Sequence, residues 1–361
     1  MRVVPIQCGG PGGAAFVELP WRIYPGRTPW VPPLREATRR ELGPESPALT
    51  RGELQLFLAL DGEEVIGRIA AFTDRLHKDR GTTGFFGYFE VVDRQDAATA
   101  LLREAAAWVR ERGARRLEGP VQLSIFHGYR VQTRGNERSP FLGEPRTPAY
   151  YPRLLRDAGF TEAARWHSWD LDRPQMEGVL SACEQGVKRL RGAAPWRVER
   201  VDLRRFDEEL VPIHRAVMGS FAPNFGYSQM SLEDFGRALA PLRAVAVEEH
   251  FFKALDASGE VVGFAFSFPD HAPAFQAMDG EASAALLRDA LPRRLVFHSF
   301  GVLPSHQRTA VAYDLGVHSL VAALEGGYEA AIGALITEGR NFLDRVGPPQ
   351  RSYAVVARGC R

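Results

Sequence analysis

Short apolar runs and longer segments of helical periodicity alternate along the first half of the chain. Residues 97–112 place Leu101, Ala105 and Trp108 on one helical face, and Gly113 follows as a stop signal. The other apolar runs are short and bounded by polar or glycine-containing corners, as strands are. The pattern therefore predicts a short helix at 150–160 and strands at 54–60, 65–72, 85–92, 115–123 and 164–172.

The second half shows the same order of elements. Residues 309–325 carry Val317, Leu320, Val321 and Leu324 at the i, i+3, i+4, i+7 spacing of a buried helical stripe. A second short helix is predicted at 340–347. The predicted strands of this half lie at 196–203, 250–256, 261–268, 294–302, 330–336 and 352–359.

Two local sequences also recur, which indicates that one unit occurs twice. "GEEVIGRIAAF" at 62–72 returns as "GEVVGFAFSF" at 259–268, and "LLRDAGF" at 154–160 returns as "FLDRVG" at 342–347. A meander followed by helix, strand, helix and strand predicts a mixed α/β architecture for each copy. We expect domains at 1–172 and 196–361, joined by a linker helix within 173–195.

Composition excludes several classes of protein. The 361 residues are 45% hydrophobic and 25% charged, and the net charge of +1 gives no general attraction to nucleic acid or to a membrane surface. The three cysteines are far apart, so neither a disulfide framework nor a metal site is expected. No run approaches the ~20 apolar residues of a spanning helix, and a cytoplasmic protein is predicted. We attribute the predominance of arginine over lysine to a GC-rich bacterial genome.

Several segments resemble the GCN5-related N-acetyltransferase (GNAT) fold, present twice. They lie at 16–34, 57–72, 84–93 and 150–160 in the first half, and at 224–227 ("NFGY") and 301–308 ("GVLPSHQR") in the second. The first half is similar, more narrowly, to bacterial GNAT-like proteins of poorly defined function. The loop before residue 150 departs from the acidic, glycine-rich loop of that family, which indicates a different small molecule. The resemblance implies two tandem GNAT-fold domains that handle acyl thioesters.

The loop between the strand at 294–302 and the helix at 309–325 is the candidate donor site. The resemblance implies a pattern of Gln or Arg, two residues, Gly, one residue, and Gly or Ala; here alanine replaces the first glycine. Backbone N–H groups at a helix N-terminus bind anions when side chains leave room, so a pyrophosphate or a phosphopantetheine phosphate is expected. The predicted donor-binding residues are Val302, Leu303, Gln307, Arg308, Thr309, Ala310, Val311 and Ala312.

The corresponding loop of the first copy reads "VVDRQDAATALL" and differs in charge. Asp93 and Asp96 place carboxylates where a pyrophosphate would lie, and no glycine is present. Repulsion between like charges at such distances is on the order of 1 kcal/mol even in solvent. The first copy is therefore predicted not to bind coenzyme A. It is expected instead to form one wall of the substrate cleft. The glycine-rich "CGGPGG" at 8–13 precedes no convincing helix and is interpreted as a flexible turn.

His298 and Tyr353 are the candidate catalytic residues. His298 lies four residues before Val302, where some GNAT members carry a general base, and an ordinary histidine pKa of ~6.5 suits that task. A half-buried structural histidine is the alternative. The resemblance places the usual tyrosine acid at Leu155 and Leu343, so it is missing from both copies. Tyr353 on the last strand is the substitute, with a core aromatic residue as the alternative.

Other polar and aromatic residues are candidates for the acceptor side. Asn224, Phe225 and Tyr227 lie in the loop through which GNAT enzymes admit the acceptor, and turn formation is the alternative. Glu90 is a candidate base of a second site, or a solvated strand end. His127, with Tyr129, Tyr150 and Tyr151, is expected on the opposite wall.

These features predict an acyltransferase. It would move an acyl group from acyl-coenzyme A, or from a phosphopantetheine thioester on an acyl carrier protein, to an amine of a small molecule, without nucleic acid or membrane partners. The alternatives are another reaction on the same fold, such as decarboxylation or aminoacyl transfer, and a binding protein without chemistry. Motifs of serine hydrolases, zinc proteases, phosphate-binding loops and dinucleotide folds are absent from the sequence.

Overall fold

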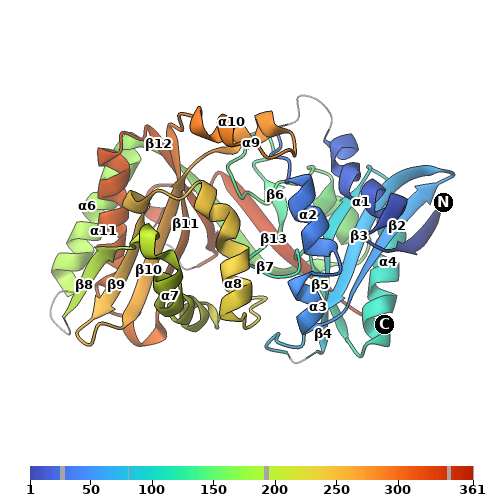
Figure 1. The fold of residues 1–361 in the computed structure, drawn as a ribbon, viewed down its shortest axis with the longest axis horizontal. Coiled ribbons are helices and arrows are strands. Elements are labelled where there is room, and N and C mark those ends of the chain that lie inside the picture. Colours follow the sequence, from blue (N-terminus) through green and yellow to red (C-terminus); the bar gives the residue numbers. More distant parts are fainter. Residues whose placement is uncertain (25–28, 80, 191–194, 340–342, 361) are drawn as a thin grey trace.

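One mixed sheet runs through the whole molecule in the computed structural model, which describes residues 1–24, 29–79, 81–190, 195–339 and 343–360 (Figure 1). The strand order is β1-β2-β3-β4-β5-β13-β7-β12-β11-β10-β9-β8, and β6 pairs with β13. Helices lie on the faces of this sheet, so each half has the layered α/β architecture that the sequence predicts. None of the described helices is both long and apolar enough to cross a membrane.

The first half contains seven of the strands. They are β1 (Arg2–Ile6), β2 (Leu54–Asp61), β3 (Glu64–Thr73), β4 (Thr83–Val91), β5 (Arg116–Gly119), β6 (Val131–Arg134) and β7 (Thr161–Asp172). The described helices of this half are α1 (Gly10–Ile23), α2 (Arg35–Leu42), α3 (Pro47–Arg51), α4 (Gln95–Glu111) and α5 (Tyr151–Asp157). The face of α4 that carries Leu101 and Ala105 is fully buried against the sheet, as its periodicity predicts.

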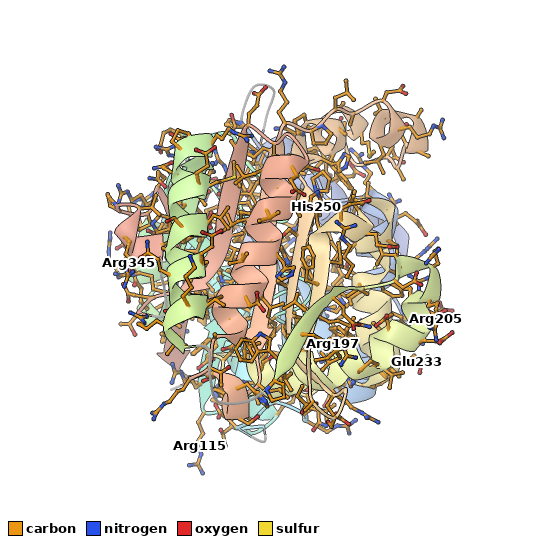
Figure 2. All side chains as sticks on the ribbon, turned by 90° about the vertical axis from the view of Figure 1, so that its left-hand side faces the viewer. Arg115, Arg197, Arg205, Glu233, His250 and Arg345 are labelled. Atoms are coloured by element: carbon orange, nitrogen blue, oxygen red, sulfur yellow. The ribbon has the colours of Figure 1, made fainter. Side chains whose placement is uncertain are left out.

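The predicted linker helix is α6 (Arg173–Leu190), and the second half follows it. Its strands are β8 (Trp196–Arg200), β9 (Phe251–Asp256), β10 (Val261–Pro269), β11 (Arg294–Val302), β12 (Ala330–Thr337) and β13 (Arg351–Gly359). Its described helices are α7 (Phe206–Phe221), α8 (Leu232–Leu239), α9 (Ala272–Met278), α10 (Ala284–Arg288) and α11 (Val311–Glu325). Figure 2 shows α6 and α11 side by side on one face of the sheet, where Gly186 leaves room for the ring of Tyr313.

The two halves exchange their last strands. β13, from the end of the chain, lies between β5 and β7, while β7 of the first half pairs with β12 of the second. Each half therefore completes its sheet with a strand that is distant in sequence. The sequence boundaries at 172 and 196 stay a prediction, but the hydrogen bonds of β7 and β13 make the sheet continuous across them.

Three sequence predictions differ from the structure. The glycine-rich segment at 8–13 is not a free turn, because α1 begins at Gly10, and a Cβ atom at Gly13 would lie 1.6 Å from the carbonyl oxygen of Cys8. The strand predicted at 115–123 ends at Gly119, since Pro120 has no N–H to donate to a ladder. Of the helix predicted at 340–347, the described part contains a 3₁₀ turn, Leu343–Arg345, in place of α-helix, and residues 340–342 lie outside the described residues.

Candidate functional site

Strands β11 and β12 diverge at the centre of the second half. Their parallel pairing covers only Arg294–Phe297 against Ala330–Gly333. His298 is the next residue of β11, and it is the extra residue of a β-bulge, because Phe266 pairs with Ser299 and Ser267 pairs with Phe297. Bulges redirect side chains and occur next to active sites. The divergence therefore opens the sheet at His298, which has no pairing partner on β12.

The side chain of His298 is held from one side. Its ring lies 5.2 Å from the ring of Phe268, and its Nδ1 is 2.8 Å from the hydroxyl of Ser299. Burial, followed by the positive charge of Arg130, lowers the pKa of His298 to about 4. The imidazole is therefore neutral at pH 7. When Nδ1 donates to Ser299, Nε2 carries the free lone pair that a general base requires, and no described residue forms a hydrogen bond with Nε2.

A long loop of the first half covers this opening. A Cβ atom at Gly143 would lie 3.8 Å from Nε2 of His298, so the segment between β6 and α5 passes beside the imidazole. Arg130, at the start of β6, stacks on Tyr129 at 3.5 Å and on Trp166 of β7 at 4.4 Å. Phe225 adds its ring at 6.2 Å from that of Trp166. Both halves therefore contribute to one aromatic wall around the opening.

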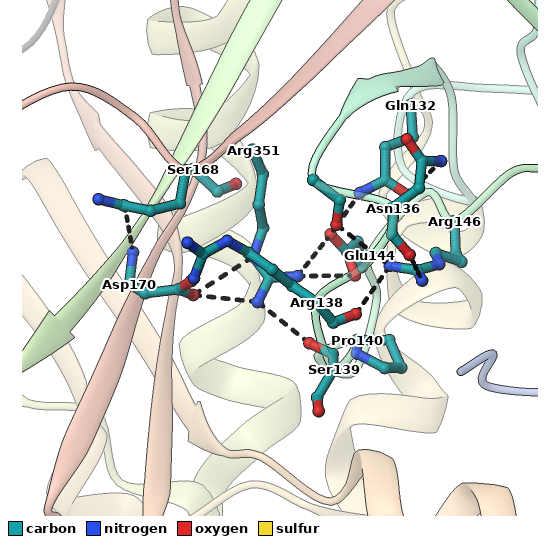
Figure 3. Close-up of polar contacts among 12 residues, drawn as sticks. Gln132, Asn136, Arg138, Ser139, Pro140, Glu144, Arg146, Ser168, Asp170 and Arg351 are labelled. Carbon is teal, nitrogen blue, oxygen red and sulfur yellow. Dashed lines mark hydrogen bonds and ion pairs between the residues drawn. The ribbon is translucent and has the colours of Figure 1, made fainter. Parts of the chain in front are cut away.

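Buried polar contacts fix the loop in this position (Figure 3). Arg351 of β13 is 1% exposed and forms ion pairs with Glu144 of the loop at 3.1 Å and with Asp170 of β7 at 3.0 Å. Arg351 also donates to the carbonyl oxygen of Ser139. Tyr353 donates its hydroxyl hydrogen to Glu144 at 2.6 Å. Because these partners come from the loop, β7 and β13, the strand exchange is also what anchors the loop.

The predicted donor loop leads into α11 without a glycine. Ala310, the residue before α11, is fully buried with φ −76°, so its conformation does not require glycine. The side chain of Gln307 donates to the carbonyl oxygen of Val302, and the hydroxyl of Thr309 accepts from the N–H of Val311, which occupies one of the expected N–H groups. Arg308 is exposed and has no ion pair with a described carboxylate. The loop therefore places an exposed cation, unpaired among the described residues, beside a helix N-terminus of which one N–H is already bonded to Thr309.

One carboxylate, outside the set of predicted donor-binding residues, lies in the first turn of α11. Asp314 accepts a hydrogen bond from the indole N–H of Trp196 at 2.8 Å, and Nδ1 of His318 lies 3.5 Å from its carboxylate. The hydrogen bond between the side chains of His318 and Asp314 raises the pKa of His318. The charge of Asp314 is thus partly satisfied by its own neighbours.

The equivalent opening of the first half is filled by tyrosines. β4 and β5 pair only from Thr83 to Phe85 and then diverge. At the end of β4, the hydroxyl of Tyr151 accepts from the N–H of Val91 at 2.9 Å, and the hydroxyl of Tyr150 donates to the carbonyl oxygen of Val91 at 2.8 Å. Val91 corresponds to Val302, since Val91 and Val302 pair with the repeated glycines Gly67 and Gly263. The backbone groups that a thioester arm would use are therefore occupied.

The charges of this first loop are also paired. Asp93 forms an ion pair with Arg153, and Arg94 forms ion pairs with Asp61 and Asp96. The repulsion expected from Asp93 and Asp96 is consequently reduced by local cations. Occupation by Tyr150 and Tyr151 is the stronger physical reason why this half is closed.

The other predicted site residues fall into two groups. Phe225 and Tyr353 lie at the central opening, in a cluster with Trp166. The buried hydroxyl of Tyr353 donates to Glu144. Burial first, and then the carboxylate of Glu144, raises the pKa of Tyr353 well above 10.0. The following residues lie elsewhere. Glu90 accepts from Tyr151 in the closed half, His127 bonds to Ser124, Tyr227 donates to Met218, and the carbonyl oxygen of Asn224 accepts from Lys78.

Burial shifts the pKa of two of these residues. It raises the pKa of Glu90, against the lowering effect of Arg68, and it lowers the pKa of His127 to about 4. The loop that carries Asn224 and Tyr227 is bound to the β3–β4 hairpin, where His77 forms a β-bridge with Ser228. Whether Glu90, His127, Asn224 and Tyr227 touch a substrate stays a prediction.

An apolar pocket adjoins the imidazole. It lies between α7 and the sheet, and its lining includes both His298 and Ser299. The only charged side chains in the lining are Glu209 and Arg243 among the residues that the structure describes. The apolar lining residues are Val201, Leu203, Phe206, Leu210, Ile213, Leu239, Leu242, Ala246, Phe251, Phe266 and Phe268. An alkyl chain attached to a group at His298 would find an apolar surface here.

Sequence reasoning missed Arg130 and Trp166 as site residues. Arg130 lies in the loop before β6 with no motif around it, and Trp166 reads as one alternating position of a strand. Only the exchange that places β7 beside β12 brings Trp166 to the opening. The described residues contain no group of three or more His, Cys, Asp or Glu side chains that could hold a metal ion.

Comparison with known proteins supports the fold. No family model matches the chain. Protein YghO of Escherichia coli K12 is 24% identical over 223 residues, 61% of this chain and 56% of the relative, and the bacterial ceramide synthase of Caulobacter vibrioides is 25% identical over 260 residues, 71% and 66% respectively. The chain thus spans less than two thirds of each of these relatives. A tandem GNAT protein from the clavulanic acid biosynthesis pathway aligns over 100% of this chain and 98% of its own, with a TM-score of 0.55 and 13% identity.

Proposed function

We propose that this chain, a tandem GNAT-like protein, is an N-acyltransferase with one active centre, located between β11 and β12 of the second half. The observation that carries the proposal is the position of His298. It is the bulge residue at the point where the two strands diverge, it is neutral at pH 7, and its Nε2 has no hydrogen-bond partner among the described residues.

Acyl transfer from a thioester to an amine requires removal of a proton from the amine. His298 would accept that proton at Nε2 while the nitrogen forms a bond to the acyl carbon and the carbon–sulfur bond breaks. The sulfur leaves as a thiolate and takes up a proton. Tyr353 is the hydroxyl candidate for this second step, although its hydrogen bond to Glu144 must then be exchanged. The loop with Gln307 and Arg308 would hold the phosphates of the donor, which is coenzyme A or a carrier-bound phosphopantetheine.

One donor site per chain is expected. Calorimetric titration with acetyl-coenzyme A should give a stoichiometry close to one, because Tyr150 and Tyr151 fill the first opening. Arg308→Glu should weaken binding about tenfold by reversing a charge near the phosphates. Arg153→Glu, the matched change at the closed loop, should leave the affinity unchanged. Two sites per chain would contradict the closure of the first half. No binding at millimolar ligand would contradict the coenzyme A version, and an acyl carrier protein would then be the donor to test.

The apolar pocket favours an acyl group longer than acetyl. Each buried methylene contributes about 0.8 kcal/mol, roughly fourfold in affinity. One of the two curated relatives is named a bacterial ceramide synthase, and ceramides are N-acyl lipids. We therefore expect kcat/KM to be at least tenfold higher for octanoyl-coenzyme A than for acetyl-coenzyme A. The measurement is thiol release in the presence of a panel of primary amines.

A variant of the pocket tests this preference. Ala246→Trp would fill the space beside Phe206 and Leu242, lowering kcat/KM for the octanoyl donor about tenfold while leaving the acetyl donor within twofold. Ala282→Trp adds the same side chain at an exposed position and serves as the control. A preference for acetyl in the unmodified protein, or a ratio unchanged by Ala246→Trp, would show that the pocket does not hold the acyl chain.

A further inference from the structure

Arg130 is a buried cation without an anionic partner. Arg130 is 8% exposed, and none of the described carboxylates forms an ion pair with its side chain. Its Nη2 donates to the hydroxyl of Tyr129, while its Nε is buried with no hydrogen-bond partner. Removing a guanidinium from water without pairing it is unfavourable, so such groups normally face a carboxylate, a phosphate or a ligand.

Apart from the hydroxyl of Tyr129, no described residue accepts a hydrogen bond from the guanidinium of Arg130. Tyr129 and Trp166 stack on the guanidinium plane at 3.5 and 4.4 Å, so the aromatic rings contact its planar faces. Stacked aromatic rings of this kind orient a guanidinium and do not consume its N–H donors. A planar, two-oxygen anion in the guanidinium plane would satisfy the donors that the described residues leave unused.

The backbone of Arg130 is held in an unusual conformation. Its φ is +98°, outside the regions that L-residues adopt without strain. Its N–H nevertheless donates to the carbonyl oxygen of Pro120 at 2.9 Å, and Val121 forms a β-bridge with Tyr129. Backbone strain of this kind persists where surrounding contacts over-determine the geometry, most often at functional sites.

Arg130 also lies within electrostatic reach of the proposed base. After burial, its positive charge is the second cause that lowers the pKa of His298, and burial lowers the pKa of Arg130 itself against the raising effects of Tyr129 and Tyr353. Glu144, which accepts from Tyr353, is itself paired with Arg351 and forms no ion pair with Arg130.

We propose that the acceptor amine carries a carboxylate and that Arg130 binds it. The acceptor is then an amino carboxylate, with its amino group presented to His298 and its carboxylate to the guanidinium of Arg130. Arg130 acts as a specificity-determining residue of the acceptor site. This inference rests on the proposed acyl transfer for its kinetic consequences, while the binding of the carboxylate itself does not depend on any turnover.

The binding test uses thermal unfolding of the full chain with the proteinogenic amino acids, each measured beside its decarboxylated amine. At least one amino acid should raise the Tm of the unmodified protein where its amine does not. In Arg130→Met, which keeps much of the side-chain volume without the charge, that shift should vanish. Arg112→Met is the matched control, because Arg112 also stacks on an aromatic ring, that of Trp108 at 3.7 Å, but at the surface.

The kinetic test uses the amino acid found in this way. Arg130→Met should raise KM for it by roughly tenfold to a hundredfold, the range of a charge-assisted hydrogen bond, and should leave KM for the decarboxylated amine unchanged. Arg130→Lys should recover only part of the loss, since lysine lacks the planar fork. Phosphoethanolamine, an amine that carries a phosphate, tests whether Arg130 binds a phosphate in place of a carboxylate.

Several results would overturn the proposal. These are the absence of any amino acid whose Tm shift exceeds that of its amine, an amino-acid shift that survives in Arg130→Met, or an Arg130-dependent shift with phosphoethanolamine alone. A protein that shows the Arg130-dependent Tm shift but no thiol release with any acyl donor would refute the proposed acyl transfer while supporting this carboxylate site. The two proposals therefore fail separately.

Discussion

Replacing His298 with alanine is expected to lower kcat for acyl transfer by about 10²- to 10⁴-fold, the usual contribution of a positioned general base. The imidazole is the bulge residue of β11 and has a free Nε2 at the opening between β11 and β12. KM for the acyl donor should change little, because the phosphates would be held at the loop near Gln307 and Arg308. The measurement is thiol release from octanoyl-coenzyme A with saturating acceptor.

The pH profile gives an independent readout of the same assignment. Because burial lowers the pKa of His298 to about 4, the base is unprotonated at neutral pH, and kcat should fall only as the pH approaches 4. Folding stability follows the same sign: the unfolded imidazole binds a proton near pH 6.5 and the folded one near pH 4, so this group's contribution is lost as pH falls through that window.

Two controls separate catalysis from folding. His318→Gln changes a half-exposed histidine of α11 and should leave kcat within twofold. The Tm of His298→Ala must also be measured, since the variant loses the contact with Phe268. If folded His298→Ala protein has the same kcat as the unmodified protein, His298 is not the base. If kcat of the unmodified protein already falls near pH 6.5, the group that titrates is another residue.

Replacing Arg351 with methionine is expected to lower the free energy of unfolding by about 3–5 kcal/mol, which is the typical result of removing one partner of a buried ion pair. Arg351 is 1% exposed and bonds to Glu144, Asp170 and Ser139. The variant would leave the carboxylate of Glu144, whose side chain is 0% exposed, without its cation. Urea unfolding followed by circular dichroism measures the difference.

The chain offers a matched control for this change. Arg138 pairs with the same Asp170 at 2.7 Å, but its side chain is 41% exposed, so Arg138→Met should cost less than about 1 kcal/mol. Adding Glu144→Gln to Arg351→Met removes the unpaired charge and should restore part of the stability. Equal effects of Arg351→Met and Arg138→Met would show that burial of the network (Figure 3) does not determine its energy.

Most elements of the fold followed from local sequence. The apolar stripe of α4, the apolar run of β11 and the glycines after α4 and α5 depend on neighbours a few residues away, and the structure confirms them. The loop before α11 was likewise recognisable, because the geometry of a helix N-terminus is local. The errors at Gly10 and Pro120 arose where a close backbone approach or a missing donor decided the outcome.

The sequence by itself therefore determined the repeated unit, the tandem GNAT-like fold and the position of His298 on β11, four residues before Val302. Only the tertiary structure decided that β13 lies between β5 and β7, that Tyr150 and Tyr151 close the first opening, and that Arg130 and Trp166 line the second. The physical reason is the range of the interactions: periodicity and capping act within one or two turns of chain. Strand exchange, stacking and buried charge instead depend on residues that are far apart in sequence.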